Sequence, residues 1–286
     1  MKHNWQMHSN LLSNLKRLPE VLTCMKETPR WWPLTLAYLG VRPLSYPFEV
    51  RLRSGELVFL SERTDLIIFW LIFVRRHYPV RKSDRVIVDV GANIGLFTLF
   101  AAREAPAARI ISIEPFPETC QRLSNLVNTN RLTERVTIVN CAISGASGVA
   151  AMDSGSTIPS QYKRIYSEAT QALNTRHRGV AADAQPEAGV TVRAETLDSV
   201  LKNLKAAPAD LVKMNIHGSE YAVLMSTPPV TLQAFNRIAV QYHELPAEAR
   251  LGKSQLFEYL DQAGFQLISD EDTRRGSGLA VFASRG

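Results

Sequence analysis

Short apolar runs alternate with amphipathic segments over the last two thirds of the chain. Buried strands are predicted at residues 86–90, 109–114, 136–140, 210–216 and 237–242, with helices from about 94, at 117–130, at 196–204 and from 218. Buried strands that alternate with helices are typical of a doubly wound, mostly parallel α/β sheet. Near the C-terminus, a helix at 253–263 precedes two strands, 265–269 and 279–284, that predict an antiparallel edge hairpin and complete seven strands.

The first 80 residues follow a different pattern, and we predict that they form a helical and short-strand extension before a catalytic domain at 81–286. Residues 9–27 have helical spacing, with Pro19 expected to interrupt the helix, and this element is predicted to be a cap or a homodimer contact. Two short strands are expected within residues 46–60, around a Ser-Gly turn. The apolar run 66–74 is well short of the roughly 20 residues that span a bilayer, so it predicts a buried helix packed on the sheet.

The periodicity disappears between residues 153 and 186, where Ser, Thr, Gln, Ala and Gly mix with scattered basic residues. A stretch of this length without periodicity is usually functional or disordered. We therefore expect an insertion at about 151–190, which is either a lid over the acceptor site or a surface loop without a role.

Composition narrows the class of protein. A hydrophobic content of 45% is enough for a sizeable core, and the net charge of +6 is spread along the chain. No dense basic block with interleaved aromatic residues occurs, so a solvated surface is favoured over nucleic-acid binding. Three scattered cysteines and the lack of a signal-peptide pattern predict neither disulfides nor structural zinc, and favour a reducing cytoplasm.

The strongest local motif lies where the first predicted strand of the sheet meets its helix. The segment reads Asp89-Val-Gly91-Ala-Asn93-Ile-Gly95, and the following strand ends on Glu114. This is half of a mononucleotide-binding βαβ unit, in which Gly91 permits a tight turn close to a ligand and Gly95 lets the helix pack against the strand. Glu114 follows at about the 20-residue interval at which a carboxylate accepts hydrogen bonds from both ribose hydroxyls.

The same motif indicates which nucleoside is bound. A dinucleotide fingerprint needs a glycine where this chain has Asn93, and Asp89 would place negative charge beside a phosphate. An acidic residue there suits the methionine end of S-adenosyl-L-methionine (AdoMet) better. The predicted cofactor is therefore AdoMet. From their positions, Asn140 and Ala142 are expected beside the adenine, with Phe116 covering one of its faces.

The segment from Asp89 to Gly95 resembles the first motif of the FkbM-like family of class I methyltransferases. Similar motifs follow in order at 113–117, 136–144, 196–200 and 211–220, so the resemblance covers roughly residues 46–284. It implies an AdoMet-dependent O-methyltransferase that acts on hydroxyls of sugars, polyketides or other small secondary metabolites.

The chain departs from that family where its acidic residues usually stand. The family's Asp-x-Glu-Gly is Asn215-Ile-His217-Gly here, and its carboxylate before a histidine is Gln241-Tyr-His243. The two histidines follow strands that converge on the site, so both are candidate general bases, with His217 the first choice. Asn215 would orient the substrate or the methionine end. Fewer carboxylates favour an acceptor that carries negative charge.

Four alternatives are weighed at this stage. A divalent cation prefers oxygen ligands, and Glu220 and Glu244 lie nearby, but the amides at 215 and 241 favour a metal-free mechanism. The chain is alternatively a catalytically impaired binding protein or an N-methyltransferase that acts on a small metabolite or peptide. A nucleotide-sugar oxidoreductase is disfavoured, because the third glycine and a Tyr-x-x-x-Lys pair are missing.

Overall fold

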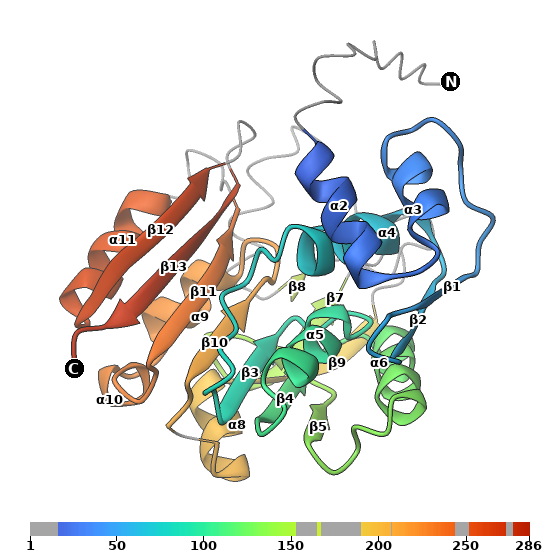
Figure 1. Ribbon diagram of the computed structural model, residues 1–286. Coiled ribbons are helices and arrows are strands. Elements are labelled where there is room, and N and C mark those ends of the chain that lie inside the picture. Colours follow the sequence, from blue (N-terminus) through green and yellow to red (C-terminus); the bar gives the residue numbers. More distant parts are fainter. Residues whose placement is uncertain (1–16, 153–164, 167–189, 207, 244–251, 273–276) are drawn as a thin grey trace, which may run out of the picture. The chain divides into compact units, whose positions relative to one another are not determined.

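The computed structural model describes residues 17–152, 165–166, 190–206, 208–243, 252–272 and 277–286 (Figure 1). The chain divides into two compact units, Met1–Tyr78 and Pro79–Gly286. Within the described residues, no helix has the length and apolar character needed to cross a membrane.

The described residues of the first unit, 17–78, form four helical segments and one hairpin. In chain order these are α2 (Leu18–Glu27), α3 (Trp31–Tyr38), β1 (Phe48–Arg51), β2 (Leu57–Leu60), α4 (Arg63–Phe69) and the π-helix η1 (Trp70–Val74). The predicted hairpin and the buried helix over 66–74 are confirmed. That helical segment contacts α2, α3 and β2, and its packing on the large sheet stays a prediction. Residues 9–16 of the predicted helix lie outside the described residues, so the interruption at Pro19 stays a prediction. In the described part, Pro19 lies in the first turn of α2, where its missing N–H has no helical partner to lose.

The second unit is built on a seven-stranded sheet of order β12-β13-β11-β10-β3-β4-β5. Its strands are β3 (Val86–Val90), β4 (Arg109–Ile113), β5 (Val136–Val139), β10 (Leu211–Met214), β11 (Arg237–Tyr242), β12 (Phe265–Asp272) and β13 (Gly278–Ser284). Strands β11, β10, β3, β4 and β5 are parallel, and the β12–β13 hairpin pairs antiparallel at one edge. The predicted fold class is confirmed.

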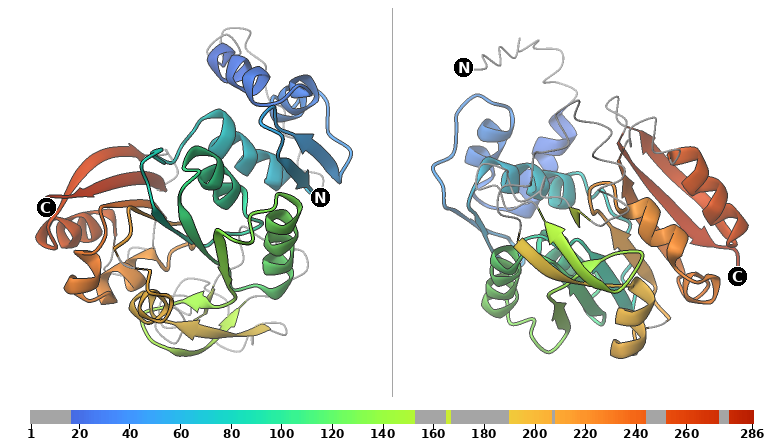
Figure 2. Two further views of the ribbon diagram at one scale, coloured as in Figure 1. Left: turned by 60° about the horizontal axis from the view of Figure 1, so that its bottom comes forward. Right: turned by 180° about the vertical axis from the view of Figure 1, so that it is seen from behind.

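Helices lie on both faces of this sheet (Figures 1 and 2). Their bounds are α5 (Leu96–Glu104), α6 (Pro117–Thr129), α8 (Leu197–Leu204), α9 (Glu220–Ser226), α10 (Pro229–Leu232) and α11 (Lys253–Gln262). Val88 and Val90 pack in one core with residues of α8, α9 and α11. Because strand residues alternate between faces, Asp89 faces the other side, where it meets α5.

Strand β3 lies between β4 and β10, so the chain leaves it in one direction along the sheet and later returns on its other side. In an open parallel sheet, ligands bind in the crevice outside the carboxyl ends of the strands at such a switch point. The residues that follow β3, β4, β10 and β11 are therefore the place to look for a site.

A second, four-stranded sheet was not predicted. It has the order β6-β9-β7-β8 and consists of β6 (Ala142–Ile143), β7 (Gly148–Met152), β8 (Ile165–Tyr166) and β9 (Val190–Glu195). Val192 and Ala194 of β9 pack on one face with Ala142, Ala150 and Phe116. Most of the predicted 151–190 insertion lies outside the described residues, so its role as a lid stays a prediction.

Candidate active site

The turn after β3 places Gly91 against the end of β10. The backbone N–H of Gly91 donates to the carbonyl of Ile113 at 3.0 Å, which joins the ends of β3 and β4. Gly91 has φ +77°, and a Cβ built on it would lie 2.2 Å from the backbone oxygen of Asn215. The left-handed conformation favours glycine, and the close approach leaves no room for a Cβ.

Asn93 and Gly95 complete the turn in the same left-handed region. Asn93 has φ +51°, a conformation that asparagine tolerates, and its Oδ1 accepts a hydrogen bond from the N–H of Ile94 at 2.7 Å. A Cβ on Gly95 would lie 2.5 Å from Cδ1 of Leu123 and 2.8 Å from Cδ2 of Leu126. Gly95 therefore makes room for α6, and the expectation that it serves packing on the strand is corrected.

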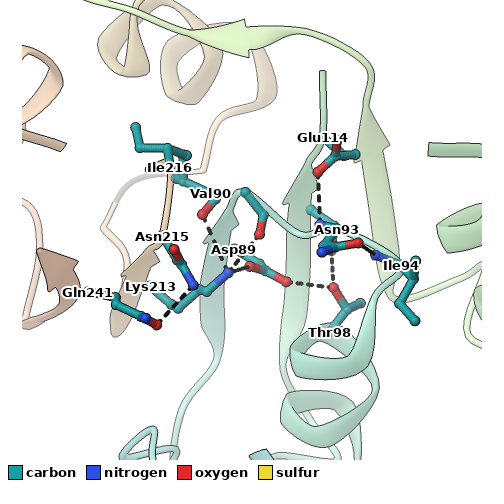
Figure 3. A network of polar contacts seen from close by, with 12 residues as sticks. Asp89, Val90, Asn93, Ile94, Thr98, Glu114, Lys213, Asn215, Ile216 and Gln241 are labelled. Carbon is teal, nitrogen blue, oxygen red and sulfur yellow. Dashed lines mark hydrogen bonds and ion pairs between the residues drawn. The ribbon is translucent and has the colours of Figure 1, made fainter. Parts of the chain in front are cut away.

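Asp89 lies beneath this turn and is 0% exposed. Its Oδ1 accepts a hydrogen bond from Nζ of Lys213 at 2.8 Å, and its Oδ2 accepts one from Oγ1 of Thr98 at 2.8 Å (Figure 3). The cationic partner predicted for Asp89 is thus supplied by the chain itself. A direct contact with the methionine end stays a prediction, which this burial disfavours.

Lys213 was missed by the sequence analysis. Its Nζ also donates to the carbonyl of Gly91 at 2.8 Å and lies 5.7 Å from the ring centroid of Phe97. The lysine therefore fixes the turn and neutralises Asp89 at the same time. The available signal was a lysine within the apolar strand Leu-Val-Lys-Met, where a cation requires a partner.

Glu114, at the end of β4, is 5% exposed and holds the turn from the other side. Its Oε2 accepts a hydrogen bond from the N–H of Asn93 at 2.8 Å (Figure 3). Its Oε1 accepts one from the N–H of Phe116 at 3.1 Å. Burial raises the pKa of Glu114 to about 7, although the two N–H groups and Lys213 favour the ionised form. A carboxylate has about four acceptor positions, so both oxygens retain capacity for a ligand hydroxyl.

The predicted adenine-side residues lie together. Nδ2 of Asn140 donates to the carbonyls of Glu114 at 2.9 Å and Pro115 at 3.0 Å, which fixes the chain after β4. Phe116 is 6% exposed and packs in the same cluster as Ala142, which is fully buried. Their contact with an adenine stays a prediction.

Asn215 and Gln241 form a neutral pair after β10 and within β11. Nδ2 of Asn215 donates to Oε1 of Gln241 at 2.9 Å (Figure 3). Oδ1 of Asn215 is buried and has no hydrogen-bond partner among the residues that the structure describes. A buried acceptor of this kind is costly unless a donor meets it, so it marks a position that a ligand donor can occupy.

The two candidate bases lie side by side, as expected from their strand ends. The ring centroids of His217 and His243 are 5.0 Å apart. Nδ1 of His243 lies 3.0 Å from Oε1 of Glu220, which is fully buried. Burial alone would raise the pKa of Glu220, but its hydrogen bond to His243 and the charge of that ring hold the pKa below its ordinary value. Within the described ranges, no group of three or more His, Cys, Asp or Glu side chains is arranged to hold a metal ion.

Comparison with known families shows the family to which this chain belongs. The sequence profile of the methyltransferase FkbM domain matches residues 89–267. The chain belongs to the FkbM methyltransferase family. The matched range contains all the predicted site residues, and the resemblance drawn from the motifs is confirmed.

Three relatives of this FkbM-family methyltransferase are about equally similar to it. AMB antimetabolite synthetase AmbE of Pseudomonas aeruginosa is 27% identical over 78% of this chain, which spans only 12% of that protein. Methyltransferase sdnD of Sordaria araneosa is 27% identical over 70% of this chain and 81% of its own length. The 31-O-demethyl-FK506 methyltransferase FkbM of Streptomyces tacrolimicus is 26% identical over 77% of this chain and 85% of its own.

A crystal structure of a methyltransferase FkbM from Methylobacillus flagellatus KT is 14% identical, with a TM-score of 0.48. The alignment covers 95% of this chain and 60% of that one. The sequence profile alone shows the family of this chain, and the structural similarity adds no support.

Replacing Gly91 with alanine in this FkbM-family methyltransferase is expected to destabilise it by clearly more than the same change at Gly264. Both glycines are left-handed, with φ +77° and +93°, but a Cβ at Gly264 meets nothing within 4 Å. The control should lose only the conformational term of about 1–2 kcal/mol. Chemical denaturation measures both variants, and equal losses would contradict the close approach to Asn215.

Proposed function

We propose that this chain transfers a methyl group from AdoMet to a hydroxyl of a small metabolite. The observation that carries the proposal is Glu114, a buried carboxylate whose two oxygens are fixed by backbone N–H groups beside the Gly91 turn. In this position each oxygen can accept one hydroxyl of a ribose. Membership of a methyltransferase family supports the same cofactor.

The residues present fit that cofactor at a second point. The buried Oδ1 of Asn215 is an acceptor that the ammonium group of a methionine end would satisfy. Lys213 already neutralises Asp89, so the turn itself adds no net charge from this pair. AdoMet supplies an activated methyl group, and the protein has to align the acceptor oxygen and remove its proton.

We assign the general-base role to His243 in preference to His217. Nδ1 of His243 lies 3.0 Å from Oε1 of Glu220, a contact that holds the ring in place and leaves Nε2 for an acceptor. Its side chain is 20% exposed, so the ring is not sealed from a substrate. His217 lies beside it and is the alternative base.

The neutral Asn215–Gln241 pair supports an acceptor that carries negative charge, since two carboxylates there would repel it. The same loss of acidic groups favours a second candidate, a catalytically impaired protein that binds AdoMet without turnover.

We also propose that the protein is cytoplasmic. A homodimer contact through α2 can be tested by analytical ultracentrifugation. Mass spectrometry of methylated products from a panel of alcohols, acids and amines separates O-methylation, N-methylation and binding alone.

The affinity for AdoMet is expected to rise about tenfold between pH 6 and pH 8. At pH 6 most of the Glu114 carboxyl is protonated, because burial raises its pKa to about 7, while two ligand hydroxyls favour the ionised form. Isothermal titration calorimetry in two buffers of different ionisation enthalpy measures the affinity and the proton released. NAD, titrated in the same way, is expected to bind far more weakly.

Glu114→Gln is the matched control, because it keeps the shape and removes the titrating group. It should weaken AdoMet binding by about 1.5–3 kcal/mol and flatten the pH dependence. Unchanged affinity with an unchanged pH dependence would remove Glu114 from the cofactor site. The stability of the free protein depends on pH in the opposite direction. Between about pH 4.5 and pH 7 the Glu114 carboxyl is protonated in the folded state but ionised in the unfolded state. The contribution of Glu114 to the free energy of unfolding therefore falls as pH rises through that window.

A further inference from the structure

Glu220 is the first residue of α9, and its buried carboxylate contacts three nitrogen atoms, two of which are backbone N–H donors. Oε1 accepts a hydrogen bond from the N–H of Ile216 at 2.8 Å and faces Nδ1 of His243 at 3.0 Å. Oε2 accepts one from the N–H of Gly218 at 2.7 Å. A carboxylate held by two backbone N–H groups cannot swing away, so its position is set by the turn after β10.

The two N–H groups lie on either side of His217 in the chain. His217 has φ +54°, a left-handed conformation that is uncommon for a histidine and needs support from its surroundings. Glu220 supplies that support, because it binds the residues before and after His217. One carboxylate thus shapes the turn that carries one histidine and contacts the ring of the other.

His243 is also held by its backbone. The hydroxyl of Tyr221, the next residue of α9, donates to the carbonyl of His243 at 2.7 Å. The start of α9 therefore fixes His243 twice, at the ring through Glu220 and at the main chain through Tyr221. These two contacts can be removed separately.

We propose that Glu220 is a positioning residue that selects the Nδ1–H tautomer of His243 and holds the turn of His217. A carboxylate accepts and does not donate, so the neutral ring of His243 must carry its proton on Nδ1 to bind Glu220. Nε2 is then the unprotonated nitrogen. What the two histidines do with that arrangement rests on the proposed methyltransferase function, but the tautomer itself does not.

The tautomer can be measured on the free, full-length protein labelled with 15N-histidine. Long-range 1H–15N correlation spectra at about pH 8.5, two units above the ordinary histidine pKa, report which ring nitrogen carries the proton. The His243 signals are assigned by their loss in His243→Gln. We expect Nδ1 in the protonated range and Nε2 in the unprotonated range. A wild-type His243 with its proton on Nε2 would overturn the inference without recourse to any variant.

Two variants separate the ring contact from the helix contact. Glu220→Gln should shift both 15N resonances toward the Nε2–H form, because an amide can offer its oxygen or its NH₂ to the ring. Tyr221→Phe removes the bond to the main chain of His243, keeps the Glu220 carboxylate, and should leave the resonances unchanged. Equal shifts in both variants, or none in Glu220→Gln, would contradict a specific role for the carboxylate.

The result does not depend on methyl transfer. A wild-type ring in the Nδ1–H form in a protein that fails to bind AdoMet would keep this inference and remove the proposed function. An active methyltransferase whose His243 carries its proton on Nε2 would do the reverse.

Discussion

Lys213→Met is expected to lower the free energy of unfolding by about 3–5 kcal/mol, the usual loss when one partner of a buried ion pair is removed. Asp89 is fully buried, and Lys213 is its cationic partner, 2.8 Å away. Methionine has a similar reach but no charge, so the carboxylate would remain without a counter-ion, and the carbonyl of Gly91 would lose a donor. Urea denaturation of the purified protein measures the change.

The matched control is Lys202→Met. Lys202 pairs with Asp198 at the same 2.8 Å, but on the surface of α8, with its side chain 71% exposed. Surface pairs of this kind contribute about 0–1 kcal/mol, so this variant should be close to wild type. Adding Asp89→Asn to Lys213→Met should restore part of the loss, because no buried charge remains. A loss below 1 kcal/mol in Lys213→Met itself would show that Asp89 does not depend on this lysine.

His243→Gln is expected to lower the rate of methyl transfer about 10²- to 10⁴-fold, the range over which a general base contributes. Glutamine retains polar groups near Glu220 but cannot take up the acceptor's proton. The affinity for AdoMet should stay near the wild-type value, since the proposed cofactor contacts come from Glu114 and Asn215. Single-turnover kinetics with an acceptor found by screening separates the chemical step from binding.

His217→Gln is the comparison, because its ring lies beside that of His243. If His243 is the base, this variant loses less activity than His243→Gln. A larger loss in His217→Gln would exchange the two roles. Near wild-type rates in both variants would mean that neither histidine is the base and that alignment alone accounts for catalysis.

The parallel strands of the large sheet were predictable because they are mostly apolar runs, unlike the largely exposed edge strand β12. The run at 86–90 coincides with β3, and the run at 237–242 coincides with β11. A strand that is buried on both faces is apolar along its whole length, so its sequence shows no alternation of apolar and polar residues. The glycine turn marks where β3 ends. The small sheet was missed at β9, where Val190, Val192 and Ala194 alternate with polar residues in the pattern of a half-buried strand. Its position after a long stretch without periodicity hid that signal.

The site was less predictable, because its key contacts join distant parts of the chain. Asp89 and Lys213 lie opposite each other on the neighbouring strands β3 and β10. The fold class predicts that such strands are neighbours, but it does not predict which of their side chains are in contact. Glu114 could be placed by its interval from Gly91, yet its bonds to Asn93 and Phe116 depend on the detailed path of two turns. His243 and Glu220 come together only because β11 follows α9 back to the same sheet edge.

The buried Asp89–Lys213 pair also limits how this chain can change over time. A neutral substitution of Asp89 or Lys213 leaves the other residue as a buried charge without a counter-ion. The first of two successive substitutions is therefore destabilising, whichever residue changes first. The two positions are therefore expected to be lost or kept together in descendants of this sequence. A hybrid enzyme that takes β3 from one parent and β10 from another will fold well only if both parents have the acidic residue in β3 and the lysine in β10, or both lack them.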